Sequence, residues 1–241
     1  MKPKFILSKS KVLQQYEKVK SISDMISYSS KTNQIVSQIL EEETDCLFSV
    51  HFVNELKHLK DFFRVIFLAQ GWSEEDIQEL ISKGINYFIV DNETDLDCLL
   101  LFLEKNEINK KINLLLRLKL KEHSVRTERY FVFGMKAGVI NKRIRELRNN
   151  SKINKLGIHF HRKTQNMAEW SLLYELSNLI DEEVLEMIDV VNMGGGLPAN
   201  YANTNVNVLP GIMNKIKKFK DWLNSKNIQM IIEPGRFIAA P

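Results

Sequence analysis

Four short segments of the chain, each placed after an apolar run, carry side chains that could act on one ligand. They hold a lysine, a histidine, a run of glycines and a Glu/Arg pair: Lys31, His161, Gly194–Gly196, and Glu233 with Arg236. A lysine that loses hydration inside a protein has a lowered pKa, and its free amine can form a Schiff base with a carbonyl compound. Because most lysines are simply solvated, Lys31 is a candidate only through its position after a strand and before Thr32-Asn33.

The glycine run and Arg236 favour a phosphate site. Three successive glycines remove every Cβ atom, so that backbone N–H groups can approach an anion closely. A glycine run alone is more typical of a tight turn without a ligand. The planar guanidinium of Arg236, which follows the next strand, is suited to binding phosphate and shifts the interpretation toward a phosphorylated ligand. We also expect the helix that follows Gly194–Gly196 to offer its N-terminal dipole to the anion.

Glu233 and His161 extend this site toward an aromatic ring. Glu233 closes the apolar run Met230–Ile232, and a buried carboxylate requires a partner, for which a protonated heterocyclic nitrogen is suitable. His161 is either a core histidine with satisfied hydrogen bonds or a flat ring that stacks on a cofactor. An amine, a phosphate site and a carboxylate match the aldehyde, phosphate and ring nitrogen of pyridoxal 5'-phosphate, which we therefore predict as the cofactor.

Short runs rich in Ile, Val, Leu and Phe alternate with amphipathic segments along the chain. Continuous apolar runs of this kind are typical of buried parallel strands. The expected strands are Met25–Ser30, which has the weakest pattern, Leu47–Val50, Val65–Ala69, Tyr87–Asp91, Asn113–Leu120, Leu156–His161, Val190–Met193 and Met230–Glu233. This rhythm predicts an α/β protein with a (β/α)₈ TIM barrel, in which the ends of the strands carry the chemistry. A doubly wound open sheet is the structural alternative.

Helix signals fill the intervals between these strands. Ser73 precedes the acidic turn Glu74-Glu75-Asp76, which predicts a capped helix that ends before Gly84. The other expected helices cover residues 35–43, 53–61, 91–103, 166–180 and 208–223. Residues 1–24, with a helix beginning near Ser8, are interpreted as an N-terminal closure segment, and residues 25–241 as the barrel.

Composition and charge exclude several classes of protein. Of the 241 residues, 44% are hydrophobic and 27% are charged, with 34 Lys+Arg against 30 Asp+Glu, which is typical of a globular chain and not of a disordered one. Because acidic residues separate the basic ones, we expect no nucleic-acid partner. Cys46 and Cys98 match neither a disulfide framework nor a zinc site, so we expect no metal. Neither a signal peptide nor a run of about 18 apolar residues is present, so we expect a cytoplasmic protein without a membrane partner.

Four motifs taken together resemble the alanine-racemase-fold decarboxylases, the pyridoxal-phosphate barrel enzymes that act on ornithine, lysine, arginine or diaminopimelate. In chain order the motifs are Tyr28-Ser-Ser-Lys31-Thr-Asn33, Phe160-His161, Gly194-Gly-Gly-Leu-Pro198 and Glu233-Pro-Gly-Arg236. The resemblance covers nearly the whole chain. It implies that Lys31 forms the Schiff base, that His161 stacks on the cofactor ring and that Glu233 keeps the ring nitrogen protonated. The other cofactor-binding residues that it implies are Thr164, Gly194, Gly195, Gly196, Gly235 and Arg236.

The resemblance also implies an activity and a partner. We expect a decarboxylase of a basic amino-acid substrate, ornithine or lysine, in polyamine synthesis, with diaminopimelate decarboxylation in lysine synthesis as the alternative. Family members are homodimers that continue into a C-terminal β domain, which supplies a Cys-Asp pair and a Tyr to the site and is absent from this chain. Because of that absence, a non-catalytic decarboxylase-like protein that binds the cofactor or a regulatory partner is a second hypothesis. An unrelated phosphate-binding barrel enzyme is a third.

The chain departs from the family pattern at three places near the site. The usual Phe-His-Val-Gly-Ser reads Phe160-His161-Arg162-Lys163-Thr164, which removes a glycine from the phosphate loop and adds two cations. Ser49 stands where an aspartate is often found, and Asn192 replaces the aspartate that commonly precedes the glycine run. The lysine that would bind the cofactor is retained.

Overall fold

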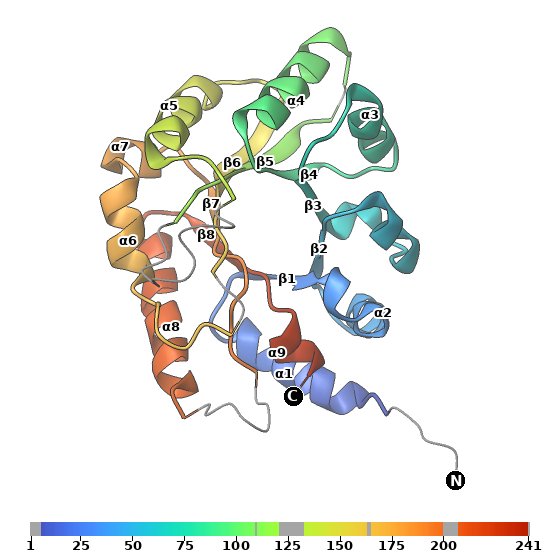
Figure 1. Ribbon diagram of the computed structural model, residues 1–241, viewed down its shortest axis with the longest axis vertical. Helices are drawn as coiled ribbons and strands as arrows, with labels where there is room; N and C mark the ends of the chain where they lie inside the picture. The colour runs from blue at the N-terminus through green and yellow to red at the C-terminus, as the bar shows by residue number, and fades with distance from the viewer. Residues whose placement is uncertain (1–5, 109, 121–132, 163–164, 200–206, 241) are drawn as a thin grey trace.

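The computed structural model describes residues 6–108, 110–120, 133–162, 165–199 and 207–240. Its parallel strands form a closed barrel in chain order, in which β8 pairs with β1 (Figure 1). The strands are β1 (Met25–Ser29), β2 (Leu47–Val50), β3 (Val65–Ala69), β4 (Tyr87–Val90), β5 (Ile112–Arg117), β6 (Ile153–His159), β7 (Val190–Asn192) and β8 (Gln229–Ile232). The closed order confirms the TIM barrel and excludes the open sheet.

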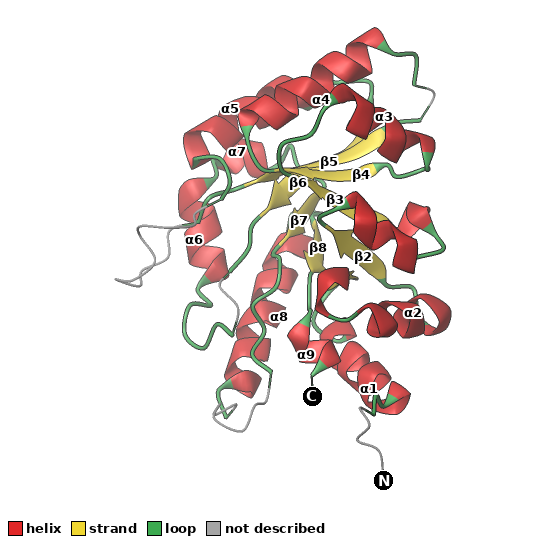
Figure 2. Ribbon diagram, turned by 45° about the vertical axis from the view of Figure 1, so that its right-hand side comes forward, coloured by secondary structure: helices red, strands yellow, loops and turns green. Residues whose placement is uncertain are grey.

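Helices surround the barrel on its outer side, as Figure 2 shows. The α-helices are α1 (Lys9–Lys20), α2 (Gln34–Glu43), α3 (Glu74–Ser82), α4 (Glu93–Lys105), α5 (Ala137–Leu147), α6 (Leu172–Leu179), α7 (Glu182–Leu185), α8 (Leu209–Ser225) and α9 (Arg236–Ala239). Short 3₁₀ helices are η1 (Ser30–Thr32), η2 (Val53–His58) and η3 (Phe62–Arg64). Among the described residues, no helix combines the length and the apolar character needed to span a membrane.

Most of the expected elements are present, and the exceptions have local causes. The helix expected over residues 166–180 begins only at Leu172, because the buried Asn166 side chain accepts hydrogen bonds from the Ala168 and Glu169 amides and forms a turn instead. The segment expected as a helix over residues 53–61 is the 3₁₀ helix η2. Helices α5, α7 and α9 are additions to the expected helices.

The strands divide the apolar side chains between two cores. Successive residues of a strand point to opposite faces of the sheet. One set fills the inside of the barrel: Met25, Leu47, Ile66, Leu68, Tyr87, Ile89, Leu115, Val190 and Ile231. The other set packs with the helices in a larger outer core. A side chain that lies two residues beyond an inward-facing one therefore points toward the open end of the barrel, above the inner core.

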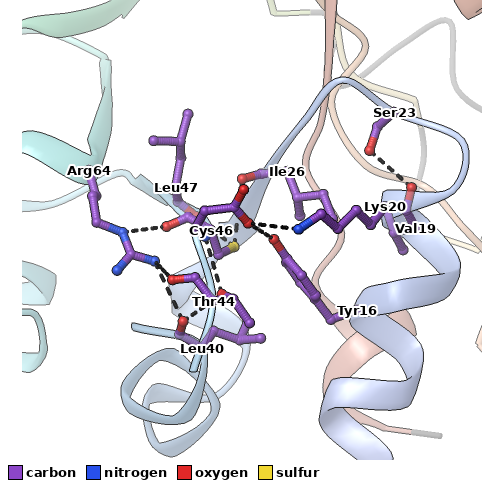
Figure 3. A network of polar contacts seen from close by, with 11 residues as sticks. Tyr16, Val19, Lys20, Ser23, Ile26, Leu40, Thr44, Cys46, Leu47 and Arg64 are labelled. Atoms are coloured by element: carbon purple, nitrogen blue, oxygen red, sulfur yellow. Dashed lines mark hydrogen bonds and ion pairs between the residues drawn. The ribbon is translucent and has the colours of Figure 1, made fainter. Parts of the chain in front are cut away.

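A polar network joins the elements at the N-terminal ends of the first strands (Figure 3). The Tyr16 hydroxyl of α1 donates to Asp45 at 2.5 Å, and Lys20 approaches the same carboxylate at 3.3 Å. Burial and this carboxylate raise the pKa of Tyr16 above its ordinary value. Arg64 donates to carbonyl oxygens near the end of α2, those of Leu40, Glu41, Thr44 and Cys46, at 2.7–3.5 Å. This end of the barrel is thus held by structural contacts, and the opposite end holds the candidate site.

Candidate active site

A cavity of about 700 Å³ opens at the C-terminal ends of the strands. Most of the residues expected to bind a cofactor line it: Lys31, His161, Gly195, Gly196, Glu233, Gly235 and Arg236. Gly194 does not line the cavity but lies beside its wall, where its carbonyl oxygen accepts from the Glu233 amide. Thr164 and Lys163 lie outside the described residues.

Lys31 and Glu233 share this cavity because their strands are neighbours. Lys31 is the middle residue of η1, directly after β1, and Glu233 directly follows β8, which pairs with β1. Glu233 is buried, with 6% of its surface exposed. Lys31 is exposed, so the expected loss of hydration is not observed. The reason is that η1 lies at the rim of the open cavity, where solvent reaches the side chain.

The Glu233 carboxylate already has protein partners on both oxygens. Ser49 Oγ and Asn192 Nδ2 donate to Oε1 at 2.7 and 2.8 Å, and His159 Nε2 lies 3.4 Å from Oε2. Burial favours the protonated acid, but His159 and these hydrogen bonds hold the pKa of Glu233 well below its ordinary value. Glu233 is therefore ionised without a ligand, and the partner that a buried carboxylate requires is supplied by the protein, while its contact with a ring nitrogen stays a prediction.

The two departures at Ser49 and Asn192 are explained by this contact. Both side chains are buried and uncharged, and both donate to the same Glu233 oxygen. An aspartate at either position would place a second carboxylate against Glu233, which would favour protonation of one of them. Serine and asparagine instead stabilise the anion.

The glycine run needs its glycines for close backbone approach. Gly194 has φ +66°, and a Cβ atom there would lie 2.4 Å from the Phe160 carbonyl oxygen. A Cβ atom on Gly195 would lie 2.7 Å from the Glu233 carbonyl oxygen. The Gly196 amide donates to no acceptor among the described residues and lines the cavity. The expected helix dipole is not found in the part of the chain that the structure describes, where the next helix after the glycine run, α8, begins at Leu209.

His161 presents a neutral ring to the cavity. The Gly195 amide donates to its Nδ1 at 3.1 Å, so the neutral ring carries its hydrogen on Nε2. The surrounding protein lowers the pKa of His161 to about 4, although the side chain is exposed where it faces the cavity. The structure places His161 at the cavity wall and not in the core, where a flat uncharged ring could stack on a ligand.

The cations near the phosphate candidates have different surroundings. Arg236 is exposed, lines the cavity, and has no hydrogen-bonding or ion-pair partner for its side chain among the described residues. Arg162, one of the two cations added to the family pattern, is 1% exposed and pairs with Glu175 of α6. Its charge is therefore neutralised within the protein, whereas the charge of Arg236 is available to an anion.

Three ionisable side chains that line the cavity were not among the site residues expected from the sequence: His51, Arg117 and His159. His51 follows β2, Arg117 ends β5 and forms an ion pair with Asp91 at 2.8 Å, and His159 ends β6. Along each strand, every second side chain faces the inside of the barrel, and each of these three residues is the next one in that series. The rule that located Lys31 and Glu233, namely that side chains at strand ends carry the chemistry, would have found them if applied to every strand.

These residues fit pyridoxal phosphate on the structure alone. An amine, a carboxylate held ionised by three donors, a flat neutral ring, and a guanidinium and a backbone amide that have no partner among the described residues all border one cavity. A closed barrel with this set at the C-terminal ends of its strands defines a cofactor-binding barrel of the kind that handles a phosphorylated carbonyl compound.

Comparison with known proteins identifies the family. The model of the pyridoxal-dependent decarboxylases, for their pyridoxal binding domain, matches residues 10–240. The chain therefore belongs to this family, and the cofactor of its domain is pyridoxal phosphate.

Individual relatives are distant but cover nearly all of the chain. Diaminopimelate decarboxylase of Campylobacter jejuni is 23% identical over 98% of this chain and 62% of its own length. A probable chloroplastic diaminopimelate decarboxylase of Oryza sativa is 24% identical over 99% of this chain and 52% of its own length. The chain thus spans between about half and three fifths of these curated relatives.

Solved structures share the fold. Lysine/ornithine decarboxylase of Vibrio vulnificus superposes with a TM-score of 0.77 at 21% identity, over 98% of this chain and 63% of that one. Diaminopimelate decarboxylase of M. jannaschi superposes with a TM-score of 0.78 at 20% identity, over 97% of this chain and 61% of that one.

Proposed function

We propose that this chain provides the cofactor-binding barrel of an amino-acid decarboxylase. The observation that carries the proposal is that Lys31, Glu233 and Arg236 border one cavity at the C-terminal end of the barrel. Membership of the pyridoxal-dependent decarboxylases supports it. The division into a closure segment, 1–24, and a barrel, 25–241, stays a prediction, as do the homodimer, the cytoplasmic location and the role in polyamine synthesis.

Each side chain has a role that follows from its position. When bound, pyridoxal phosphate supplies the electron-accepting ring that stabilises the carbanion left by departing CO₂. Lys31 would hold the aldehyde carbon, and the Glu233 carboxylate would keep a proton on the ring nitrogen. The Gly196 amide and the Arg236 guanidinium would bind the phosphate. His161 would cover one face of the ring.

The proposed substrate is a diamino acid. We place diaminopimelate before ornithine and lysine, because both curated relatives described above are named for it. Ornithine and lysine, the substrates expected from the sequence, are supported by the fold of the Vibrio vulnificus enzyme. Ser49 and Asn192 contact Glu233, which would hold the cofactor, so these two departures do not distinguish the substrates.

Absorption spectroscopy tests the cofactor site. Purified protein mixed with pyridoxal phosphate is expected to show the visible band of the lysine-bound cofactor, and borohydride reduction is expected to fix the label on the peptide that contains Lys31. Lys31→Ala should abolish both signals, whereas Lys57→Ala, on an exposed residue of η2, should keep them. A band that survives in Lys31→Ala would reject the proposal.

Release of CO₂ from diaminopimelate, ornithine and lysine then tests the activity. Turnover of diaminopimelate in preference to the other two is the expected result. A labelled protein that turns over none of the three would contradict the enzymatic proposal and support the non-catalytic alternative.

A further inference from the structure

Two loops at the open end of the barrel are joined on both sides of Gly196. One loop follows β6, and the other, which holds the glycine run, follows β7. On one side of Gly196, the Gly195 amide donates to His161 Nδ1 at 3.1 Å. On the other side, Ala199 is bound by the side chain of Gln165. Gly196 therefore lies between two contacts that connect the same pair of loops.

The Gln165 carboxamide binds both polar backbone groups of one residue. Its Oε1 atom accepts from the Ala199 amide at 2.6 Å, and its Nε2 atom donates to the Ala199 carbonyl oxygen at 3.1 Å. Ala199 is buried, and buried backbone groups require hydrogen-bonding partners. Because Ala199 belongs to no strand or helix of the described chain, Gln165 takes the place of a backbone partner.

Gln165 has a backbone conformation that residues with a side chain rarely adopt. Its φ angle is +57°, in the left-handed region that favours glycine. The next residue, Asn166, is fully buried, and its amide donates to the Gly196 carbonyl oxygen at 2.9 Å. The left-handed residue thus binds Ala199 with its side chain, while the amide that follows it binds Gly196. These contacts compensate for the unfavourable φ angle, which persists only where the surrounding structure holds it.

These contacts leave one polar backbone group of Gly196 available to a ligand. Its carbonyl oxygen is bound by the Asn166 amide, whereas its own amide donates to no acceptor among the described residues. Gly196 has φ +103° and lines the cavity. Arg236 lines it too, and its side chain likewise has no partner in the described chain. A backbone N–H group and a guanidinium that border one cavity are suitable donors to phosphate oxygens.

Building on the proposed function, we propose that Gln165 is a positioning residue for phosphate recognition. By binding Ala199, it fixes the loop after β7 against the loop after β6 and keeps the Gly196 amide oriented toward the phosphate. Gln165 is not among the described residues that line the cavity, so it acts through the loop and not by direct contact. A loop that is already ordered loses less conformational freedom when the anion binds, and this raises the affinity for the phosphate group.

Comparison of pyridoxal phosphate with pyridoxal, which lacks the phosphate group, tests this role. Titration of the visible band of the lysine-bound compound gives both dissociation constants. Gln165→Ala is expected to weaken binding of pyridoxal phosphate about tenfold and to leave binding of pyridoxal unchanged, because the two hydrogen bonds that it removes order only the phosphate loop. Gln78→Ala, on an exposed residue of α3, should change neither constant. If the ratio of the two constants in Gln165→Ala equals that of the wild type, the proposal is overturned.

Amide hydrogen exchange in the cofactor-free protein, followed by nuclear magnetic resonance, gives a second measurement. Gln165→Gly suits the positive φ angle and lacks only the side chain, so any change is not due to added backbone strain. The Ala199 amide is expected to exchange about tenfold faster in this variant, because it loses its acceptor. An unchanged exchange rate at Ala199 would show that Gln165 does not hold the loop and would overturn the proposal.

Failure of this inference is distinguishable from failure of the proposed function. If the wild type binds no pyridoxal phosphate, the decarboxylase proposal fails, and exchange in the presence of inorganic phosphate still tests Gln165. Phosphate is then expected to slow exchange of the Gly196 amide in the wild type and to have no effect in Gln165→Gly; equal protection in the two proteins, or none in either, would overturn the inference. If the cofactor binds and the Gln165 variants match the wild type, only the role of Gln165 is rejected.

Discussion

Glu233 combines burial with ionisation, and its neighbours explain how. A carboxylate taken out of water loses hydration free energy unless hydrogen bonds replace the water. Ser49, Asn192 and His159 provide these bonds from three different strands, β2, β7 and β6. The anion is therefore organised by the barrel before any ring nitrogen approaches it, which lowers the free energy needed to place a protonated ring there.

Asn192→Asp tests this organisation at nearly constant shape. The new carboxylate would lie at the position of an amide that is now 2.8 Å from Glu233 Oε1. Two carboxylates at this distance repel each other, so we expect the free energy of unfolding to fall by about 3 kcal/mol at neutral pH. Urea denaturation of the cofactor-free protein measures the change.

The pH dependence of the stability of Asn192→Asp shows whether charge repulsion causes the loss. As the pH falls, one shared proton relieves the repulsion, so the difference from the wild type should shrink. Asn54→Asp, on an exposed residue of η2 whose side chain has no hydrogen-bond partner among the described residues, is the matched control and should be close to neutral. A deficit that is constant with pH would mean that the loss of the amide, and not the repulsion, destabilises the protein.

Single residues of the site were predictable where their neighbours in sequence carried a signal. Lys31 and Glu233 stand beside motif residues, and Gly194–Gly196 is conspicuous by composition. His51 and Arg117 follow ordinary apolar runs, so only the barrel register shows that they point into the same cavity. The partners of Glu233 could not be derived from spacing, because they come from strands far apart in the chain.

At the level of elements, buried strands were easier to predict than helices. Every expected strand is present with small shifts at its ends, because parallel strands in a barrel are apolar on both faces and stand out as continuous runs. Helices depend on local competition. The Asn166 side chain bonds backbone amides that a longer α6 would use, and a periodic apolar pattern does not show this.

Arg64 provides a test at the scale of elements, because one side chain joins α2, β2 and η3. Its guanidinium donates to four carbonyl oxygens and lies 5.1 Å from the centre of the Phe48 ring. Arg64→Met removes this donor, and of the four carbonyl oxygens that of Leu40 keeps its bonds from Thr44, so we expect a loss of about 3 kcal/mol in the free energy of unfolding.

The position of the Arg64 contacts predicts that the affinity for the cofactor should not change. Arg64 lies at the N-terminal ends of the strands, and the cavity opens at the other end, so Arg64→Met should bind pyridoxal phosphate with wild-type affinity wherever it is folded. Lys57→Met, an exposed change of the same kind, should leave the urea midpoint unaltered. Equal midpoints for the two variants would show that the Arg64 contacts add nothing to stability.

For the whole molecule, closure of the barrel is the property that the sequence could not show. Counting strands is compatible with an open sheet, and only the pairing of β8 with β1 distinguishes the two. Closure also brings His51, which follows β2, to the same cavity as His159 and His161, which lie at the end of β6. Because these histidines are held in one cavity, they together make the stability of the whole molecule depend on pH.

We expect these histidines to make the protein less stable in mild acid. Burial lowers the pKa of His51 and His161 to about 4 from an ordinary 6.5 and lowers the pKa of His159 as well. The unfolded chain therefore binds more protons than the folded one as the pH falls below 6.5. The stabilising contribution of these histidines is complete above 6.5, declines on acidification and is lost near 4. Below an ordinary value of 4.5, protonation of Glu233 in the unfolded chain adds to the decline.

Urea denaturation at a series of pH values measures this effect. Because His161 is exposed toward the cavity and its charge is screened, we expect His51 and His161 together to lower the free energy of unfolding by only about 2 kcal/mol between pH 6.5 and pH 4. The double variant His51→Gln/His161→Gln binds no extra protons at these positions on unfolding, so its stability should decline less steeply over the same range. If the double variant keeps the wild-type slope, the acid sensitivity does not originate from His51 and His161, and their shared environment in the cavity does not produce it.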